Sequence, residues 1–224
     1  MAVVRTARQA FGHPGIAPRW TRSAKDAVGT AYAASSRVWF TMSRGVLNEV
    51  YYPTVDRPQI RDLQYLITDG RSFFHDERRH LKCTSEYIDD RSLGVRVTSV
   101  DPEQRYRIEK EIITSPRQAC VLVRTQFTAL DPSPQPLRLF ALLAPHLDGG
   151  GWGNSGFVAV QNGREVLVAH KGTVWLALAA TIPFLRCSCG YVDRSDGWTD
   201  LAENYEMDWE FDARRESGSR AGPL

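Results

Sequence analysis

The sequence predicts an all-β fold, a large antiparallel β-sandwich, and three observations point to it. Hydrophobic and polar residues alternate with period two in several stretches, among them 93–100, 104–113 and 120–128, which is typical of half-buried antiparallel strands. No amphipathic helical stripe is longer than about two turns. Turn-forming pairs interrupt the alternating stretches at intervals suited to a sandwich: Asp69-Gly70, Asp101-Pro102, Asn162-Gly163, Lys171-Gly172 and Asp196-Gly197.

The chain is expected to contain three parts. Residues 1–29 form an irregular lead-in packed on the sandwich, because glycine and proline recur in this segment. Residues 30–212 form the β-sandwich domain, in which the proline-rich segment 131–136 is a long loop between strands. Residues 213–224 form a disordered tail, because they are small and polar and have nothing to bury.

Individual elements can be expected within the sandwich. Residues 37–53 form a hairpin, because two runs rich in β-branched and aromatic residues flank the turn Ser43-Arg44-Gly45. The pair Asn162-Gly163, between two alternating runs, predicts the clearest two-residue hairpin of the chain. Residues 190–211 are rich in aromatic and acidic residues and form either a final strand or a short helix that closes the sandwich.

Composition excludes several classes of protein. With 42% hydrophobic and 24% charged residues the chain has the balance of a globular protein, so wholesale disorder is not expected. A net charge of +2 without a block of lysine or arginine argues against a strongly basic nucleic-acid binder. The longest apolar run, 174–180, is far too short to span a bilayer. The first residues lack the apolar segment of a secretory signal, so a cytoplasmic location is expected.

The four cysteines do not predict a metal site. Only Cys187 and Cys189 lie near one another, and a C-x-C pair without further cysteine or nearby histidine is a poor zinc site. Buried or free thiols are therefore expected at Cys83, Cys120 and this pair.

No catalytic motif is recognisable. A G-x-S-x-G nucleophile motif, a histidine spacing for metal binding and a phosphate-binding loop are all missing from the sequence, so no cofactor or metal is expected. Glycoside hydrolysis needs two carboxyl groups on either side of one bond. Glu49 lies between aromatic residues, but an ion pair with Arg37 or Arg61 is a simpler expectation for it than catalysis. The other acids considered are Asp62, Glu86, Glu109 and Glu111, of which the last two lie on a polar strand face.

Two groups of residues are candidates for binding. Residues 144–157 hold five glycines between an apolar strand and the next alternating run, so that backbone and side chains of the loop can approach a neighbour closely. One interpretation is a flexible loop at the end of the sandwich. The other is a site for a carbohydrate or a partner domain, since tryptophan stacks on sugar rings and asparagine bonds their hydroxyls. The residues expected to make such contacts are Tyr51, Tyr52, His146, Trp152 and Asn154.

Four long motifs carry a resemblance to a known family. They read GHPGIAPRWTRSAKDAVGTA, SRVWFTMSRGVLNEVYYPTVDRPQIRDLQYLITDG, LLAPHLDGGGWGNSG and YVDRSDGWTDLAENYEMDWEFD. Together they resemble the N-terminal domain of bacterial glucoamylases and glucodextranases of glycoside hydrolase family 15. The resemblance covers residues 11–212, almost the whole chain.

The resemblance implies a fold and a partner. The family's N-terminal domain is a large antiparallel β-sandwich of the galactose-mutarotase-like type. It packs against an (α/α)6 barrel, which holds the two catalytic glutamates and hydrolyses α-glucosidic bonds with inversion. This sequence ends where the barrel would begin, so no residue is expected to be a catalytic acid or base. Truncation before the catalytic barrel and a stand-alone domain both remain open.

The leading functional prediction is therefore a non-catalytic module that supports the barrel and its carbohydrate cleft. The expected partners are an α-glucan or oligosaccharide and the barrel, with neither nucleic acid nor membrane. One alternative is a free-standing carbohydrate-binding module. A less favoured alternative is a mutarotase-like enzyme, for which His146 with Glu49 is the only pair that can be proposed.

Overall fold

The computed structural model describes residues 3–4, 8–131 and 136–214. Their contacts divide the chain into two compact units, each of which is described by itself. We call Trp20–Ala144 the sandwich unit. We call Met1–Arg19 together with Pro145–Leu224 the terminal unit, because it contains both ends of the chain.

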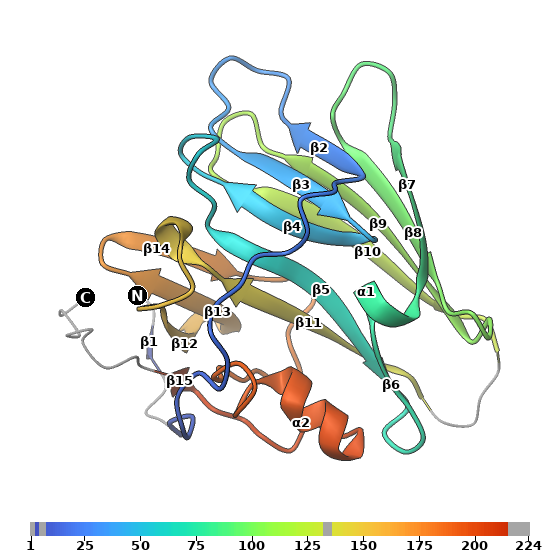
Figure 1. Ribbon diagram of the computed structural model, residues 1–224, viewed down its shortest axis with the longest axis vertical. Helices are drawn as coiled ribbons and strands as arrows, with labels where there is room; N and C mark the ends of the chain where they lie inside the picture. The colour runs from blue at the N-terminus through green and yellow to red at the C-terminus, as the bar shows by residue number, and fades with distance from the viewer. Residues whose placement is uncertain (1–2, 5–7, 132–135, 215–224) are drawn as a thin grey trace. The chain divides into compact units, whose positions relative to one another are not determined.

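The sandwich unit is built from two sheets (Figure 1). The first sheet has the order β11-β5-β4-β3-β2, with β6 paired to β5. Its strands are β2 (Ala27–Thr30), β3 (Trp39–Ser43), β4 (Val46–Tyr51), β5 (Ile60–Thr68), β6 (Phe74–Asp76) and β11 (Arg138–Pro145). The second sheet has the order β10-β9-β8-β7. Its strands are β7 (Lys82–Tyr87), β8 (Val95–Val100), β9 (Tyr106–Thr114) and β10 (Val121–Ala129). The short helix α1 (Glu77–His80) connects β6 to β7.

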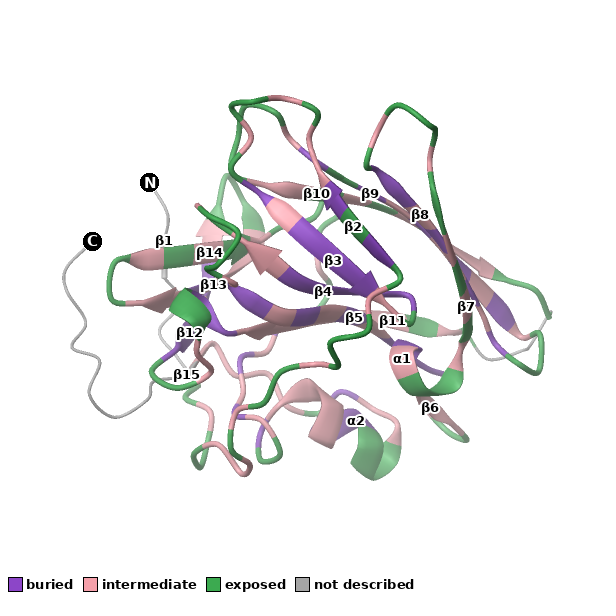
Figure 2. Ribbon diagram, turned by 45° about the horizontal axis from the view of Figure 1, so that its top comes forward, coloured by how far each residue is buried: buried purple, intermediate pink, exposed green. Residues whose placement is uncertain are grey.

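A hydrophobic core joins these two sheets. Ile67 from β5 and Tyr106 and Ile108 from β9 are fully buried and pack together, with Phe127 from β10 beside them. The buried residues of β8 and β9 alternate with more exposed ones, as a sheet with one buried face requires. Figure 2 shows buried residues along β3, β4 and β8. The strands predicted from period two at 93–100, 104–113 and 120–128 are thus confirmed.

The outer face of the second sheet carries a row of alternating charges. Glu86, Arg96, Glu111 and Arg124 lie opposite one another on the four strands. Arg96 is 2.9 Å and Arg124 is 3.3 Å from the Glu111 carboxylate. Such exposed pairs contribute about 0–1 kcal/mol each.

An ion pair in which both side chains are buried lies inside the sandwich unit. Lys110 breaks the hydrophobic alternation of β9, and its side chain is buried. Its Nζ donates to Glu77 Oε1 at 2.5 Å and to the carbonyl oxygen of Gly45. Ser99 donates to the same Glu77 oxygen at 2.8 Å. Since these elements come from both sheets, the pair links α1 and the β3–β4 turn to β9.

The terminal unit has one sheet, in the order β1-β12-β13-β14, with β15 also paired to β12. Its strands are β1 (Val3–Val4), β12 (Ser155–Gln161), β13 (Arg164–Lys171), β14 (Val174–Leu178) and β15 (Ala213–Arg214). Val158 of β12 packs in a small core with Cys187 and Cys189. The β12–β13 turn contains Asn162 and Gly163 with φ of 51° and 74°, so the predicted two-residue hairpin is confirmed.

The segment 190–211 contains a short helix, α2 (Gly197–Asn204). The Asp196 carboxylate begins this helix by accepting hydrogen bonds from the backbone N–H groups of Trp198 and Thr199, each at 2.9 Å. The helix ends at Tyr205, whose φ is 70°. Of the two alternatives expected for this segment, the short helix is the one observed.

The strands of both units pair antiparallel in registers such as β9–β10 and β12–β13, and the all-β class is confirmed. Three strands differ from the expectation. β1 lies inside the expected irregular lead-in 1–29 and β2 begins inside it, and β15 forms at the start of the expected tail 213–224. Residues 215–224 of that tail lie outside the described residues. Compact units defined by contacts do not by themselves mark domain boundaries, so the expected domain limits stay a prediction.

None of the four cysteines is in a disulfide, and Cys187 and Cys189 are buried. In the described parts of the chain no helix is both long and apolar enough to cross a membrane. The cytoplasmic location stays a prediction.

Candidate functional site

The glycine-rich loop predicted to bind lies in the terminal unit, between β11 and β12. It begins with the 3-10 turn η1 (Leu147–Gly149). Asn154 is fully buried and organises the loop: its Oδ1 accepts from the Leu147 N–H at 3.0 Å and its Nδ2 donates to the Gly150 carbonyl oxygen at 2.9 Å. Lys171 Nζ donates to the Leu147 carbonyl oxygen at 3.1 Å. In this conformation Asn154 holds the loop together and does not present its amide at the surface.

His146 and Trp152 differ in their access to solvent. His146 is buried, whereas Trp152 is 55% exposed. The backbone of Gly151 passes close to the His146 ring, since a Cβ there would lie 2.7 Å from His146 Nε2 and 2.4 Å from Cβ of Pro18. Close approach therefore explains this glycine. Of the three residues predicted in the loop, Trp152 is the one that can meet a ligand or partner without rearrangement.

Replacing Asn154 by Ala is expected to lower the free energy of unfolding by about 2–3 kcal/mol, because backbone groups of Leu147 and Gly150 lose their partners. Urea denaturation followed by tryptophan fluorescence measures the change. Gln161→Ala, at an exposed position of β12, is the matched control and should stay within about 0.5 kcal/mol of the parent. Equal stability of the Asn154 and Gln161 variants would contradict this account of the loop.

The predicted tyrosines lie in the sandwich unit, at the end of β4. Tyr51 lies opposite Trp39 of β3 and is half-buried, and burial together with the nearby Glu49 carboxylate raises the pKa of its hydroxyl. Tyr52 is 37% exposed, and its carbonyl oxygen accepts from Gln59 Nε2 at 2.6 Å. The tyrosines belong to the sandwich unit and the loop residues to the terminal unit, and each group is described by itself. Their contact roles stay predictions.

Glu49 is buried beside these tyrosines in a structural network. Its Oε1 accepts from Lys25 Nζ at 2.8 Å and from the Thr21 hydroxyl at 3.0 Å. Its Oε2 accepts from the Thr41 hydroxyl at 2.5 Å. Burial alone would raise the pKa of Glu49, but the bonds from Lys25, Thr41 and Thr21 outweigh burial and leave the pKa below its ordinary value.

The expected ion pair of Glu49 with Arg37 or Arg61 is wrong, because the cation is Lys25. Arg61 instead donates through Nε to the neighbouring Asp62 carboxylate at 3.0 Å. Lys25 comes just before β2 and is brought to β4 by the pairing of β2 with β3, a placement that depends on the sheet order. The sequence alone does not show this sheet order, so Lys25 was not expected as the partner of Glu49.

The lowered pKa of Glu49 predicts how the stability of the folded chain changes at acidic pH. A carboxyl group whose folded pKa is lowered contributes stability above its unfolded pKa, about 4.3, and that stability is lost as the pH falls through the folded pKa. Lys25→Met removes the cation, so unfolding measured from pH 7 to 3 should show a smaller loss on acidification. Lys82→Met, at an exposed lysine, should keep the parent's pH profile. Identical profiles for the Lys25 variant and the parent would refute this role.

The other acids considered for catalysis are paired with arginine. Asp62 is bound by Arg61, Glu109 lies 3.2 Å from Arg107, and Glu86 and Glu111 both contact Arg96. A shallow depression of about 310 Å³ lies over this charged face, lined by Thr84, Ser85, Glu86, Arg96 and Thr98. Each of these four carboxylates is paired with an arginine on the same sheet, an arrangement that stabilises the sheet surface and leaves none of the four poised to protonate a leaving group.

Sequence reasoning missed an aromatic group on the sheet of the terminal unit. The rings of His170 and Trp175 stack with centroids 4.6 Å apart, and Phe157 packs edge-on to Trp175 at 6.3 Å. Trp175 is 50% exposed. We call Phe157, His170 and Trp175 the aromatic strip. Pairing 164–171 with 174–178 across Lys171-Gly172 would have placed His170 opposite Trp175, so the signal was present in the predicted turn.

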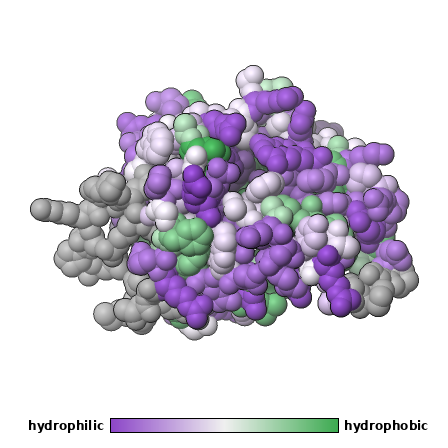
Figure 3. All heavy atoms as spheres, turned by 60° about the horizontal axis from the view of Figure 1, so that its bottom comes forward, coloured by the Kyte–Doolittle hydropathy of each residue, from purple (hydrophilic) through white to green (hydrophobic). Residues whose placement is uncertain are grey.

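Two exposed aliphatic side chains follow β14 and were also missed. Ile182 is 78% exposed and Leu185 is 99% exposed. The face drawn in Figure 3 is largely hydrophilic, with hydrophobic residues in small separate areas. Isolated exposed aliphatic residues are common, and these two are accessible for contact with another polypeptide.

Three comparisons with known proteins agree. A family model described as glucodextranase, domain N, matches residues 10–219. A glucoamylase of Clostridium sp. (strain G0005) is 36% identical over 206 residues, which are 92% of this chain and 29% of that protein. A crystal structure of a bacterial glucoamylase complexed with acarbose matches with a TM-score of 0.93 and 34% identity, over 96% of this chain and 32% of the other. The chain thus spans about a third of the length of these relatives.

Proposed function

Because this chain belongs to the glucodextranase domain N family, we propose that it is the non-catalytic N-terminal β-sandwich module of a glucoamylase-like glycoside hydrolase. In this proposal the module supports the remainder of such an enzyme, an (α/α)6 barrel, and borders the cleft in which the barrel binds carbohydrate. The enzyme as a whole would act in carbohydrate metabolism. The paired carboxylates of the sandwich unit support a structural rather than catalytic role.

The observation that carries the proposal is a set of exposed hydrophobic side chains in the terminal unit. Trp152, Ile182 and Leu185 are each more than half exposed. Burying one large apolar side chain at an interface contributes about 1.5–3 kcal/mol. A chain that spans about a third of its relatives has a partner of suitable size in the rest of such an enzyme.

The test is association with the remaining part of the Clostridium glucoamylase, co-expressed as a separate polypeptide. The double variant Ile182→Ser/Leu185→Ser should weaken co-purification about tenfold or more, because both side chains lose their buried contacts. Leu122→Ser, at a 52% exposed leucine of β10, is the control in the sandwich unit and should bind like the parent. Equal binding by the double variant and the control would contradict a role for Ile182 and Leu185 in this association.

Carbohydrate binding by the isolated chain is a second candidate function, favoured by the aromatic strip and Trp152. An exposed tryptophan that is stacked on a neighbouring ring offers a rigid apolar face on which a pyranose can stack. Titration with maltose or isomaltose oligomers, followed by tryptophan fluorescence, should give a saturable change that Trp175→Ala abolishes. A silent titration would leave the supporting role as the better account. A mutarotase-like activity is least supported, because Glu49 is bound by Lys25.

A further inference from the structure

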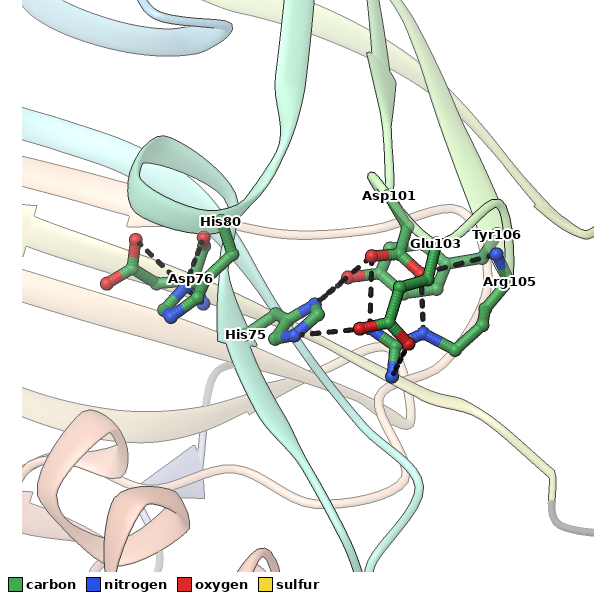
Figure 4. Close-up of polar contacts among 7 residues, drawn as sticks. All are labelled: His75, Asp76, His80, Asp101, Glu103, Arg105 and Tyr106. Carbon is green, nitrogen blue, oxygen red and sulfur yellow. Dashed lines mark hydrogen bonds and ion pairs between the residues drawn. The ribbon is translucent and has the colours of Figure 1, made fainter.

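A cluster of ionisable groups surrounds His75, away from the surfaces considered so far. His75 lies on β6 of the first sheet, and its side chain is 14% exposed. Its Nδ1 is 2.7 Å from the hydroxyl oxygen of Tyr106, and its Nε2 is 3.4 Å from a guanidinium nitrogen of Arg105. Figure 4 shows the imidazole between the His80 ring and the turn between β8 and β9. The ring therefore connects the two sheets of the sandwich unit.

The partners of His75 determine its protonation state. A guanidinium group only donates hydrogen bonds, so the Nε2 atom that faces Arg105 must be the acceptor. The ring proton then lies on Nδ1, from which it is donated to the Tyr106 oxygen. The geometry thus fits a neutral imidazole with the proton on Nδ1.

Arg105 is held firmly in its position. Its Nε and a terminal nitrogen donate to the two oxygens of the buried Asp101 carboxylate, at 2.5 and 3.0 Å. Glu103 lies 3.4 Å from the same guanidinium group, which also packs over the Phe73 ring at 4.3 Å. A guanidinium fixed on two sides by acids and on its face by a ring cannot move away from His75 without losing these contacts.

Charged and titratable groups face His75 from each element that packs against it. His80 of α1 stacks on it with centroids 4.8 Å apart and an interplanar angle of 4°, and the Asp76 backbone N–H donates to His80 Nδ1 at 3.0 Å. Asp101 Oδ1 lies 3.8 Å from His75 Nδ1. Burial, His80 and Arg105 lower the pKa of His75, and the two acids Asp101 and Glu103 only partly oppose them.

We propose that His75 is a proton-sensitive latch between the two sheets of the sandwich unit. The latch is closed while the ring is neutral, and it opens when Nε2 gains a proton, because the new N–H group would face the N–H groups of Arg105. The segment 74–80 has a second attachment, the buried bond from Lys110 to Glu77. Opening therefore loosens this segment from the β8–β9 turn while the core stays folded.

The sign of the pH effect follows from linkage. The unfolded chain has a histidine pKa of about 6.5, and the folded pKa of His75 lies below that value. Between the two values the open or unfolded state binds more protons, so the closed state is fully favoured above about pH 6.5 and loses this advantage as the pH falls through the folded pKa. The opening equilibrium rises by up to about tenfold per pH unit in that window.

The first test is a histidine NMR titration of the full chain. At pH 8 the His75 ring should show a protonated Nδ1 and an unprotonated Nε2. Arg105→Gln should raise the His75 titration midpoint by about one pH unit or more, because a cation is removed and the Asp101 charge is left unpaired. A ring protonated on Nε2 at pH 8, or a midpoint unchanged in the Arg105 variant, would overturn the latch.

The second test is hydrogen exchange of residues 74–80 and 101–106 from pH 7.5 to 5, corrected for intrinsic rates. Exchange should accelerate on acidification in the parent, and the acceleration should be lost in His75→Gln. His13→Gln, at an exposed histidine, is the matched control and should behave like the parent. The same acceleration in His75→Gln as in the parent would refute the proposal. The titration of the parent decides the matter if His75→Gln does not fold.

Discussion

Replacing Lys110 by Met is expected to lower the free energy of unfolding by about 3–5 kcal/mol. The substitution leaves the buried Glu77 carboxylate with Ser99 and a backbone N–H as donors but without its cation, and it removes the donor to the Gly45 carbonyl oxygen. An uncompensated buried charge is one of the few single changes with an effect of this size. Urea denaturation at pH 7 measures the loss.

The double variant Glu77→Gln/Lys110→Met separates charge from packing. Because the double variant has no buried carboxylate without a cation, it should be clearly more stable than Lys110→Met alone. The Gly45 carbonyl oxygen still lacks its donor in both variants. Lys82→Met, at an exposed position of β7, should change stability by no more than about 0.5 kcal/mol. A Lys110 variant as stable as the Lys82 variant would show that the pair contributes nothing.

Gly190→Ala is expected to destabilise the terminal unit by about 3 kcal/mol or more. A Cβ at this position would lie 1.8 Å from the carbonyl oxygen of Ser195 and 2.6 Å from the nitrogen of Asp196. Both atoms belong to backbone that leads into α2, and the Ser195 N–H is already bonded to Tyr191. The backbone must therefore shift, and the cap that Asp196 provides for α2 shifts with it.

Gly197→Ala is the matched control for this prediction. Gly197 is the first residue of α2, and a Cβ there would meet no atom within 4 Å. Alanine in a helix is favoured over glycine by up to about 1 kcal/mol, so this variant should be as stable as the parent or slightly more stable. Thermal unfolding of the two variants side by side checks both expectations. Similar melting temperatures would mean that Gly190 is not constrained as described.

The fold could be predicted because the evidence for it is local. Alternation in 104–113 placed Tyr106, Ile108 and Ile112 on one face of a strand, and all three are buried. The resemblance to the N-terminal domain of glucoamylases and glucodextranases is confirmed by the comparisons. Lys110 could not be assigned from the pattern, because its partner Glu77 lies 33 residues away on another element.

The candidate site could be predicted only in part. The glycine-rich loop was recognised from its composition, but the burial of Asn154 depends on how the loop folds back on its own backbone. Leu185 was overlooked because a leucine is expected in a core by default, and exposure of 99% cannot be read from residue type. The contact roles of Trp152, Tyr51 and Tyr52 stay predictions.

The division of the chain has a consequence for its synthesis on the ribosome. The sandwich unit is one continuous stretch, so it can fold as soon as its last strand has emerged. The sheet of the terminal unit pairs β12 with both β1 and β15, and the Ala10 N–H donates to the Ala213 carbonyl oxygen at 2.9 Å. The segment that holds β1 must therefore wait for β12, which follows the whole sandwich unit in the sequence, before its strand gains a neighbour. A nascent chain that has emerged from the ribosome only as far as the end of β11 should carry a folded sandwich unit and an unpaired β1.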